Sequence, residues 1–301
     1  MPMLSLTEAV AALGAFLRLR RDGGMVRPEL AARLDAVLGA LGVYDAVNEL
    51  SEQEAAVLLG FVEGFLAQST DFVVNPGRTS WDYEDTSILI AQGQTSASLA
   101  PVFRRFVVPS LGAGLAARME AGGASFLDVG TGIAALAVAM CRLWPALRVV
   151  GVDPWEPALT LARERVARAG LAERIDLRQM AAETLEDADE HDLAWVPTFF
   201  IASTVLERVI ERVHAALRPG GYAIFGLYTR PDDPLAAVVA DLRTVRQGGA
   251  PHTPQEMTAL LARSGFADID VLFDVAWRVP VVFVVGRRRA HADGRQGGCS
   301  S

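Results

Sequence analysis

Apolar residues recur at helical spacing through the first third of the chain. The first such stripe consists of Leu6, Val10, Leu13 and Leu17. A second stripe begins behind Pro28, whose fixed φ suits the first turn of a helix, and Ser51 with Glu54 forms a capping-box sequence before a third. The periodicity fails over residues 68–80, where we expect a connecting segment. The pattern predicts amphipathic helices that bury their stripes in a core or against another subunit of a homodimer.

Short apolar runs alternate with helical segments in the remainder of the chain. The expected strands cover 126–129, 148–153, 175–179, 193–197, 222–227, 269–273 and 281–285. This alternation predicts an α/β fold with a doubly wound, mostly parallel seven-stranded sheet and helices on both faces. We therefore expect a helical N-terminal domain over residues 1–120, the sheet domain over 121–290 and a polar, disordered tail over 291–301.

A glycine-containing turn joins the first expected strand to a helix. Residues 128–132 are Asp-Val-Gly-Thr-Gly, and glycines at such a turn let the backbone approach a ligand closely. With Ala135 the spacing also fits the dinucleotide fingerprint, whose turn holds a diphosphate. Asp128 would repel a diphosphate but would attract the ammonium and sulfonium of S-adenosylmethionine. The motif favours a cationic adenosyl ligand, with a nicotinamide nucleotide as the alternative.

A second acidic residue, Asp153, ends the next expected strand. In a βαβ unit an acid at this position accepts hydrogen bonds from ribose hydroxyls. The structural alternative is an ordinary N-cap for the helix that begins near Pro157. Together with the glycine turn, Asp153 predicts a nucleoside site at the carboxyl edge of the sheet.

Three segments, 128–132, 150–153 and 217–221, resemble in sequence and order the motifs of class I S-adenosylmethionine-dependent methyltransferases. The resemblance extends over the sheet domain and is loose in the N-terminal third. It implies a Rossmann-like methyltransferase fold with S-adenosylmethionine as cofactor, the first motif holding the methionine part and Asp153 the ribose. Where this family often has an acid that contacts the adenine amine, this chain has Ala181, so a backbone group would make that contact or it would be absent. The cofactor-binding residues that we predict are Asp128, Gly130, Thr131, Gly132, Asp153, Pro154, Met180, Ala181, Trp195 and Pro197.

Aromatic residues near the expected cofactor site suggest where an acceptor would bind. The segment 81–85 is Trp-Asp-Tyr-Glu-Asp and is either a lid over the cofactor or a surface loop whose Trp81 enters the core. A glycine-containing turn is expected at residues 92–94. Phe199 and Phe200 follow the fourth strand and should lie opposite Gly130, because ligands bind at the carboxyl ends of parallel strands. The predicted substrate-binding residues are Trp81, Tyr83, Gln94, Phe199 and Phe200.

Methyl transfer from a sulfonium is an in-line displacement, so positioning supplies much of the rate. A base is needed only if the nucleophile carries a proton. His252 and Tyr83 are the candidate catalytic residues, since histidine titrates in the useful range and Tyr83 lies in the aromatic segment. His191 and His214 are expected to be structural, and His291 falls in the tail. No metal-ligand spacing is visible, so we expect no metal.

Composition and charge restrict the partners. The chain has 301 residues and a net charge of −8, which argues against nucleic acid as a partner. Its 2 cysteines suggest neither a disulfide framework nor a metal site. The N-terminus lacks signal-peptide architecture and we expect no membrane-spanning apolar run, which predicts a cytoplasmic protein without a membrane partner.

The expected function is transfer of a methyl group from S-adenosylmethionine to an oxygen or nitrogen of a small, partly aromatic metabolite, in secondary metabolism. Two alternatives remain open. One is a protein that binds the adenosyl ligand without transfer, as a scaffold or a repurposed cyclase. The other is a nicotinamide-dependent oxidoreductase.

Overall fold

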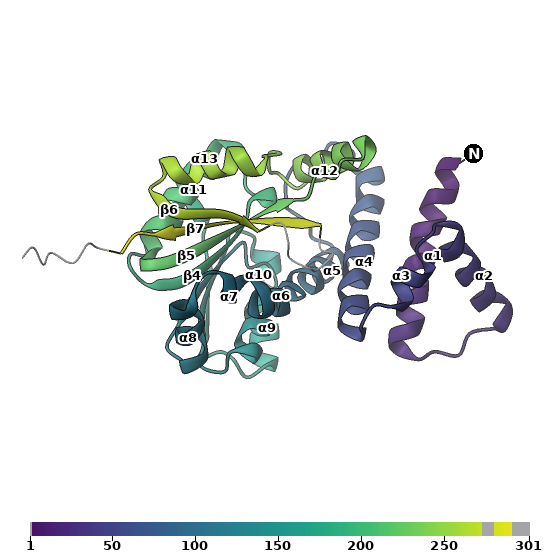
Figure 1. Cartoon of the computed structure of the whole chain (residues 1–301), viewed down its shortest axis with the longest axis horizontal. Coiled ribbons are helices and arrows are strands. Elements are labelled where there is room, and N and C mark those ends of the chain that lie inside the picture. The colour runs from purple at the N-terminus through teal and green to yellow at the C-terminus, as the bar shows by residue number, and fades with distance from the viewer. Residues whose placement is uncertain (1, 273–279, 291–301) are drawn as a thin grey trace, which may run out of the picture.

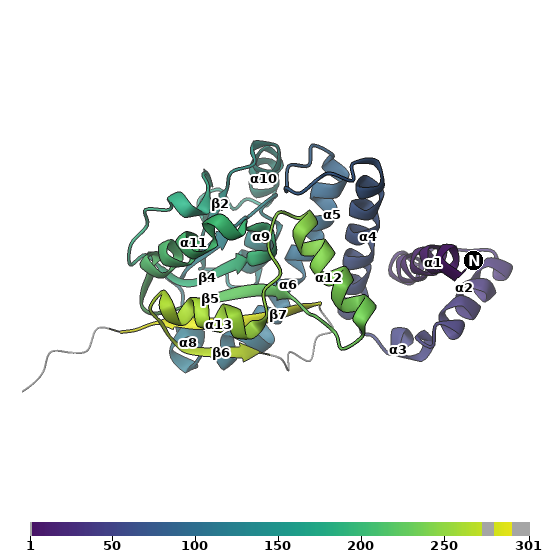
Figure 2. The ribbon, with the colours of Figure 1, turned by 90° about the horizontal axis from the view of Figure 1, so that it is seen from above.

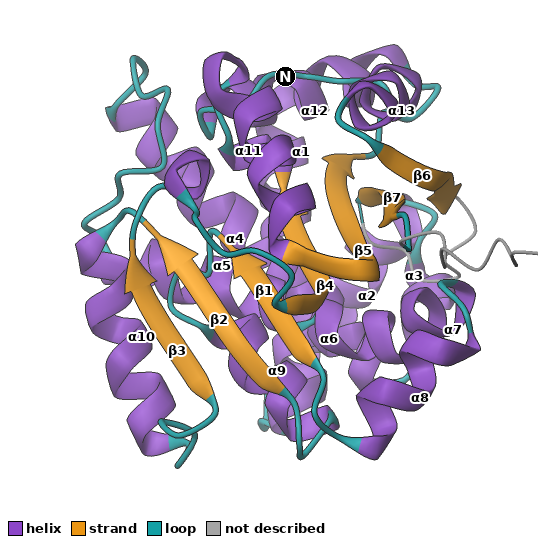
Figure 3. Cartoon of the chain, turned by 90° about the vertical axis from the view of Figure 1, so that its left-hand side faces the viewer, coloured by secondary structure: helices purple, strands orange, loops and turns teal. Residues whose placement is uncertain are grey.

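The computed structural model describes residues 2–272 and 280–290. Its centre is a seven-stranded sheet in the order β3-β2-β1-β4-β5-β7-β6 (Figure 3). The strands are β1 (Ser125–Val129), β2 (Arg148–Asp153), β3 (Ile175–Gln179), β4 (His191–Pro197), β5 (Leu217–Tyr228), β6 (Phe266–Leu272) and β7 (Val281–Arg288). β7 runs antiparallel to both neighbours, and the other pairs are parallel. The predicted fold class is confirmed, while residue 273 of the sixth expected strand and the expected tail at 291–301 lie outside the described residues.

Helices cover both faces of the sheet because successive side chains of a strand point to opposite sides. In β1, Phe126 belongs to the core cluster on one face and Leu127 to the cluster on the other. The first face is covered by α8 (Ala113–Ala121), α9 (Ala135–Leu143) and α10 (Glu156–Arg168), and the second by α11 (Ser203–Ala216) and α13 (Pro254–Arg263). Strands buried on both sides explain the nearly continuous apolar runs in the sequence.

The N-terminal third is helical, as predicted. Its helices are α1 (Pro2–Asp22), α2 (Pro28–Ala40), α3 (Tyr44–Asn48), α4 (Glu52–Val74) and α5 (Thr86–Ala97). Figure 1 shows α1 to α3 at the end of the molecule farthest from the sheet, with α4 between them and α5. Leu17 and Leu59 belong to a small separate core, whereas Phe61 of α4 joins the main core. The boundary at residue 120 and the homodimer stay predictions.

Shorter elements complete the chain. α6 (Leu99–Val102), a π-helical turn η1 (Phe103–Val107) and α7 (Val108–Ser110) connect α5 to α8. The 3-10 turns η2 (Ala182–Thr184) and η3 (Thr198–Phe200) flank β4. α12 (Pro234–Arg246) follows β5 and lies beside α4 at the carboxyl edge of the sheet (Figure 2).

Two local expectations are wrong, and one helix was not predicted. α4 continues through Gln68 to Val74, so only residues 75–80 form the connecting segment. Residues 92–94 lie inside α5 and form no turn. α12 is absent from the sequence prediction altogether. The capping box of Ser51 and Glu54, in contrast, is confirmed.

α4 also requires a correction to the expected absence of a membrane-length apolar run. The helix has 23 residues, and an 18-residue stretch of it has a mean hydropathy of 1.4, so it is long and apolar enough to cross a membrane by length and composition alone. In the structure this helix packs against α1 and α5, and its Ala55, Leu59 and Phe61 are buried in the protein. A buried core helix passes the same test, so the absence of a membrane partner and the cytoplasmic location stay predictions.

Candidate functional site

The glycine turn between β1 and α9 folds over the end of β2. The N–H groups of Gly130 and Thr131 donate to the Val152 carbonyl at 2.8 and 3.1 Å. Gly130 and Gly132 have φ values of 65° and 55°, a region that glycine enters without steric penalty. The turn therefore needs these glycines for its own backbone, besides the close approach to a ligand that they permit.

A cavity of about 230 Å³ opens in front of this turn at the carboxyl edge of the sheet. Nine residues predicted from the sequence line it: Trp81, Gly130, Thr131, Gly132, Asp153, Pro154, Ala181, Pro197 and Phe200. α5 closes one side with Leu89, Gln92, Gly93 and Ser96, none of which was predicted as a site residue. The structure thus brings the glycine turn, the tip of β2 and the first aromatic residues of the expected acceptor site to one cavity.

Asp153 connects the cavity wall to the glycine turn. Its Oδ2 accepts a hydrogen bond from the Gly132 N–H and its Oδ1 one from the Trp155 N–H, both at 2.8 Å. Burial raises the pKa of this carboxyl, while the two backbone donors lower it. Each carboxylate oxygen can accept a second hydrogen bond, so Asp153 keeps acceptor capacity for a ligand hydroxyl.

Asp128 lies deeper, at the end of β1. It is buried, and its Oδ2 accepts a hydrogen bond from Thr131 Oγ1 at 2.7 Å. Burial raises the pKa of Asp128 to about 7, the Thr131 hydrogen bond lowers it, and the neighbouring charge of Asp153 raises it. The carboxyl therefore changes charge near neutral pH.

A smaller pocket of about 30 Å³ adjoins the cavity, and Asp128 lines it. Six aromatic residues also line it: Phe61, Phe65, Trp195, Phe199, Phe200 and Tyr228. Gln92, Ser96, Thr131, Pro197 and Phe200 line both spaces, so the two are neighbours. The Phe199 ring stacks on Tyr228 with centroids 4.4 Å apart, and Phe200 packs on Trp81 at 4.6 Å. We call this space the aromatic pocket.

Four predicted site residues do not line the cavity or the aromatic pocket. Tyr83 is 1% exposed and packs with Ile133 in a cluster behind Trp81. Gln94 is exposed, because it lies on the outward side of α5. Met180 packs against the core on the α11 side of the sheet. His252 lines a separate space of about 10 Å³ between β5 and α12.

The aromatic segment 81–85 is attached to the sheet domain rather than free. The indole Nε1 of Trp155 donates to the Tyr83 carbonyl at 2.8 Å. Asp85 accepts from the Ser87 N–H at 2.8 Å and caps α5. Only Trp81 of this segment lines the cavity, so Tyr83 holds the segment in place instead of facing a ligand.

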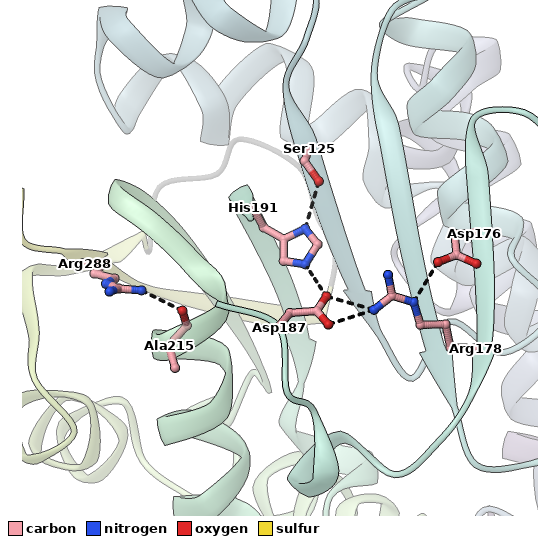
Figure 4. A network of polar contacts seen from close by, with 7 residues as sticks. All are labelled: Ser125, Asp176, Arg178, Asp187, His191, Ala215 and Arg288. Atoms are coloured by element: carbon pink, nitrogen blue, oxygen red, sulfur yellow. Dashed lines mark hydrogen bonds and ion pairs between the residues drawn. The ribbon is translucent and has the colours of Figure 1, made fainter. Parts of the chain in front are cut away.

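A second polar cluster lies away from the cavity (Figure 4). His191 contacts Ser125 Oγ through Nδ1 and Asp187 Oδ2 through Nε2, both at 2.8 Å, and Arg178 binds Asp187 at 2.8 and 3.0 Å. Asp187, Glu190 and His191 have the spacing of a metal site. Arg178 and His191 already engage Asp187, and burial lowers the pKa of His191. The polar contacts of this cluster therefore connect β1, β3 and β4.

The sheet domain is similar to known methyltransferases. Residues 126–221 match the family model of a methyltransferase domain. A phosphatidylethanolamine N-methyltransferase from Cereibacter sphaeroides is 34% identical over 126 residues, 41% of this chain and 60% of that protein. The S-adenosylmethionine-dependent methyltransferase SibL superposes with a TM-score of 0.63 at 21% identity, over 96% of this chain and 98% of its own. An O-methyltransferase family protein from Burkholderia thailandensis gives a TM-score of 0.61 at 15% identity, over 97% and 98% of the two chains.

These similarities differ in extent. The family-model match falls on the sheet domain, and the chain spans 60% of the length of the relative from Cereibacter sphaeroides. The two solved structures cover nearly the whole chain, so the N-terminal helices recur in their fold as well.

Proposed function

We propose that this chain, whose residues 126–221 form a methyltransferase domain of the class I family, transfers a methyl group from S-adenosylmethionine to an oxygen or nitrogen of a small aromatic acceptor. One observation carries the proposal. The glycine turn and Asp153 line a cavity that directly adjoins a pocket with aromatic walls. A cofactor in the first space and an acceptor in the second would be neighbours.

The residues of the cavity fit S-adenosylmethionine. Gly130 and Gly132 present backbone without a Cβ, and Asp153 has acceptor capacity for ribose hydroxyls. Ala181 and Ala182 line the wall beyond Asp153, where they suit the flat adenine ring. The described residues that line the cavity include two acids, Asp153 and Glu183, and no basic side chain, so a cationic adenosyl ligand is favoured over a diphosphate-bearing nicotinamide nucleotide.

When bound, S-adenosylmethionine supplies a methyl group on a sulfonium that an acceptor lone pair can attack. The protein positions the acceptor beside this methyl group and excludes water from the site. Phe199 and Phe200 form one wall of the aromatic pocket, and α5 covers the junction of the two spaces with Gln92 and Ser96. A wall of this kind holds a planar acceptor at a fixed distance and excludes water, which supplies much of the rate of a displacement.

The test is transfer of a labelled methyl group. The protein is incubated with S-adenosylmethionine carrying a trideuteromethyl group and with a panel of phenols and anilines, and products are analysed by mass spectrometry. We expect a deuterated acceptor together with S-adenosylhomocysteine. Tight binding of both adenosyl ligands without transfer to any acceptor would favour a binding protein, and binding of reduced nicotinamide nucleotide instead would favour an oxidoreductase.

The charge of Asp128 predicts how cofactor affinity depends on pH. Its pKa of about 7 means that the carboxyl gains its negative charge as the pH rises through neutrality. The ionised form attracts a cationic ligand, so affinity for S-adenosylmethionine should rise over that interval. A ligand that lowers this pKa by about one unit gains about tenfold in affinity on ionisation. Calorimetric titrations between pH 6 and 8, about one unit on each side of that pKa, measure the change.

Asp128→Asn is the matched control, because it keeps the shape and cannot ionise. Over the same pH interval, the cofactor affinity of this variant should no longer follow ionisation of residue 128. It should follow only ionisation of the ligand's own amine. S-adenosylhomocysteine keeps the ammonium but lacks the sulfonium, so an equal loss for both ligands would assign Asp128 to the ammonium. Identical profiles for the variant and the unmodified protein would remove Asp128 from cofactor recognition.

A further inference from the structure

A buried polar network joins three helices next to the aromatic pocket. Gln68 of α4, Arg246 of α12 and Gln247 at the C-cap of α12 are all buried. Gln68 Oε1 accepts hydrogen bonds from Gln247 Nε2 at 2.9 Å and from Arg246 Nη2 at 3.3 Å. Gln68 Nε2 donates to Gln92 Oε1 of α5 at 3.2 Å. The network thus runs from the C-terminal end of α12 through α4 to α5.

Arg246 fixes the direction of the hydrogen bonds in this network. A guanidinium has donors only, so the atom of Gln68 that faces it must be the amide oxygen. The amide nitrogen of Gln68 then faces Gln92, which must accept with its own oxygen. Gln247 likewise donates to Gln68, and its oxygen accepts from the Tyr228 hydroxyl at 2.8 Å. A reversed amide would place two donors or two acceptors against each other and leave buried polar groups unpaired.

Gln92 extends this polarity into the site. Its side chain lines both the cavity and the aromatic pocket. Its oxygen is engaged by Gln68, and its amide nitrogen forms no hydrogen bond among the described residues. The N–H groups are therefore the part of Gln92 that remains for a ligand, and they can only donate. Where the two spaces meet, the protein offers a hydrogen-bond donor whose direction is set by the buried network.

A donor at this position distinguishes an oxygen nucleophile from a nitrogen one. A hydroxyl oxygen has two lone pairs, so it can accept a hydrogen bond with one and attack the methyl carbon with the other. The nitrogen of an aromatic amine has a single lone pair, which cannot do both, and its N–H groups would face those of Gln92. In transfer to a hydroxyl, the second lone pair forms the carbon–oxygen bond. The sulfur–methyl bond breaks with its electron pair going to sulfur, and the hydroxyl proton is lost to water.

We infer that Gln92 binds the acceptor oxygen through its amide N–H and so selects aromatic hydroxyl compounds over aromatic amines, while Gln68 and Arg246 position that amide. The inference rests on the proposed function, which it narrows from an oxygen or nitrogen to an oxygen. It also gives a reason for a buried arginine that has no carboxylate partner among the described residues. A carboxylate at position 68 would pair with Arg246 but would reverse the amide of Gln92.

The experiment uses two neutral ligands of the same shape on the protein loaded with S-adenosylhomocysteine. Anisole presents an ether oxygen that only accepts a hydrogen bond, and N-methylaniline presents an N–H that donates. Calorimetry should show a preference for anisole of about three- to tenfold, the range for one neutral hydrogen bond. Gln92→Met has a side chain of similar length without the amide and should abolish this preference. Gln53→Met is the control, because Gln53 is an exposed glutamine at the start of α4.

Gln68→Glu is the sharper variant, because it should reverse the preference. A carboxylate still accepts from Arg246 and Gln247 but has no N–H to donate. Gln92 must then turn its own N–H toward residue 68 and its oxygen toward the ligand. N-methylaniline should now bind more tightly than anisole, and in transfer of the labelled methyl group aniline should gain relative to phenol. Both binding probes are neutral, so the added charge alone does not predict a reversal.

Several results would overturn the inference. They are equal affinity for the two probes or binding of neither in the unmodified protein, a preference that survives Gln92→Met, and a preference for anisole that persists in Gln68→Glu. A loss of S-adenosylhomocysteine affinity in Gln92→Met would assign the amide to the cofactor instead. Thermal unfolding shows whether each variant is folded, and Gln68→Glu keeps the test valid if Gln92→Met unfolds, because it gives Arg246 a carboxylate partner. Failure of the unmodified protein to bind S-adenosylhomocysteine would contradict the proposed function, and the same titrations on the unloaded protein would still test the donor at Gln92.

Discussion

Asp153→Ala is expected to weaken binding of S-adenosylmethionine and S-adenosylhomocysteine by about ten- to a hundredfold. A carboxylate that accepts hydrogen bonds from both ribose hydroxyls contributes about 1.5–3 kcal/mol. Both ligands carry the same ribose, so the affinity for both should fall by the same factor. Isothermal titration calorimetry on the folded variant measures the change.

Asp153 also supports the glycine turn, and the two roles have to be separated. The alanine variant leaves the Gly132 and Trp155 N–H groups without their acceptor, which should lower the free energy of unfolding by about 1–2 kcal/mol. Binding of adenosine and of methionine, measured separately, distinguishes loss of the ribose contacts from collapse of the glycine turn. Loss of ribose contacts weakens adenosine alone, whereas a collapsed turn weakens both.

Two further variants complete this test. Asp153→Asn retains one oxygen acceptor, so its affinity for both ligands should lie between that of Asp153→Ala and that of the unmodified protein. Asp232→Ala removes an exposed acid that makes no hydrogen bond within the described ranges, and should change nothing. Unchanged adenosine affinity in Asp153→Ala would reduce Asp153 to a support of the turn.

The sheet and the cofactor side of the site could be predicted because their signals are local. A buried strand, a glycine turn and a helix start are adjacent in sequence, and the tip of β2 follows one helix later. The order of parallel strands then places Asp153 and Pro197 on either side of Gly130 by a general rule. No long-range information was needed for these residues.

The errors in α4 and α12 share one physical origin, which is that these two helices bury polar residues and expose apolar ones. α4 places Gln68 in the core and exposes Val73 and Val74, so its apolar period fails before the helix ends. α12 exposes Leu235 at 68% while burying Arg246, which hid the helix and its arginines from a search for apolar stripes.

The choice of Gln94 shows how one local error changes a site. A glycine between two glutamines suggests a turn, but Gly93 lies inside a helix. On a helix, positions 89, 92, 93 and 96 share a face, and that face lines the cavity. Gln94 points away for the same reason. Tyr83 and His252 were selected for their chemistry. The chemistry of a side chain does not tell how far it lies from the cavity.

Gly93→Ala should separate α5 from the glycine turn and weaken cofactor binding. A Cβ at this position would lie 2.4 Å from Ile133 Cδ1, 2.5 Å from Ile133 Cγ1 and 3.3 Å from the Cβ of Ala135. Ile133 is buried and lines the cavity, so it cannot move without disturbing the turn. Overpacking of this kind costs about 1–3 kcal/mol, against a gain of up to about 1 kcal/mol from replacing glycine by alanine in a helix.

Gly39→Ala in α2 isolates the helix-propensity gain, because a Cβ there meets no atom within 4 Å. It should be neutral or stabilising, whereas Gly93→Ala should lower the unfolding temperature and the affinity for S-adenosylhomocysteine together. Ile133→Ala removes both colliding atoms, so the Gly93→Ala/Ile133→Ala double variant should recover affinity relative to Gly93→Ala alone. A double-mutant cycle measures this coupling. Additive losses would mean that α5 does not rest on the turn through Gly93, and the close approach of this helix would then have no part in shaping the cavity.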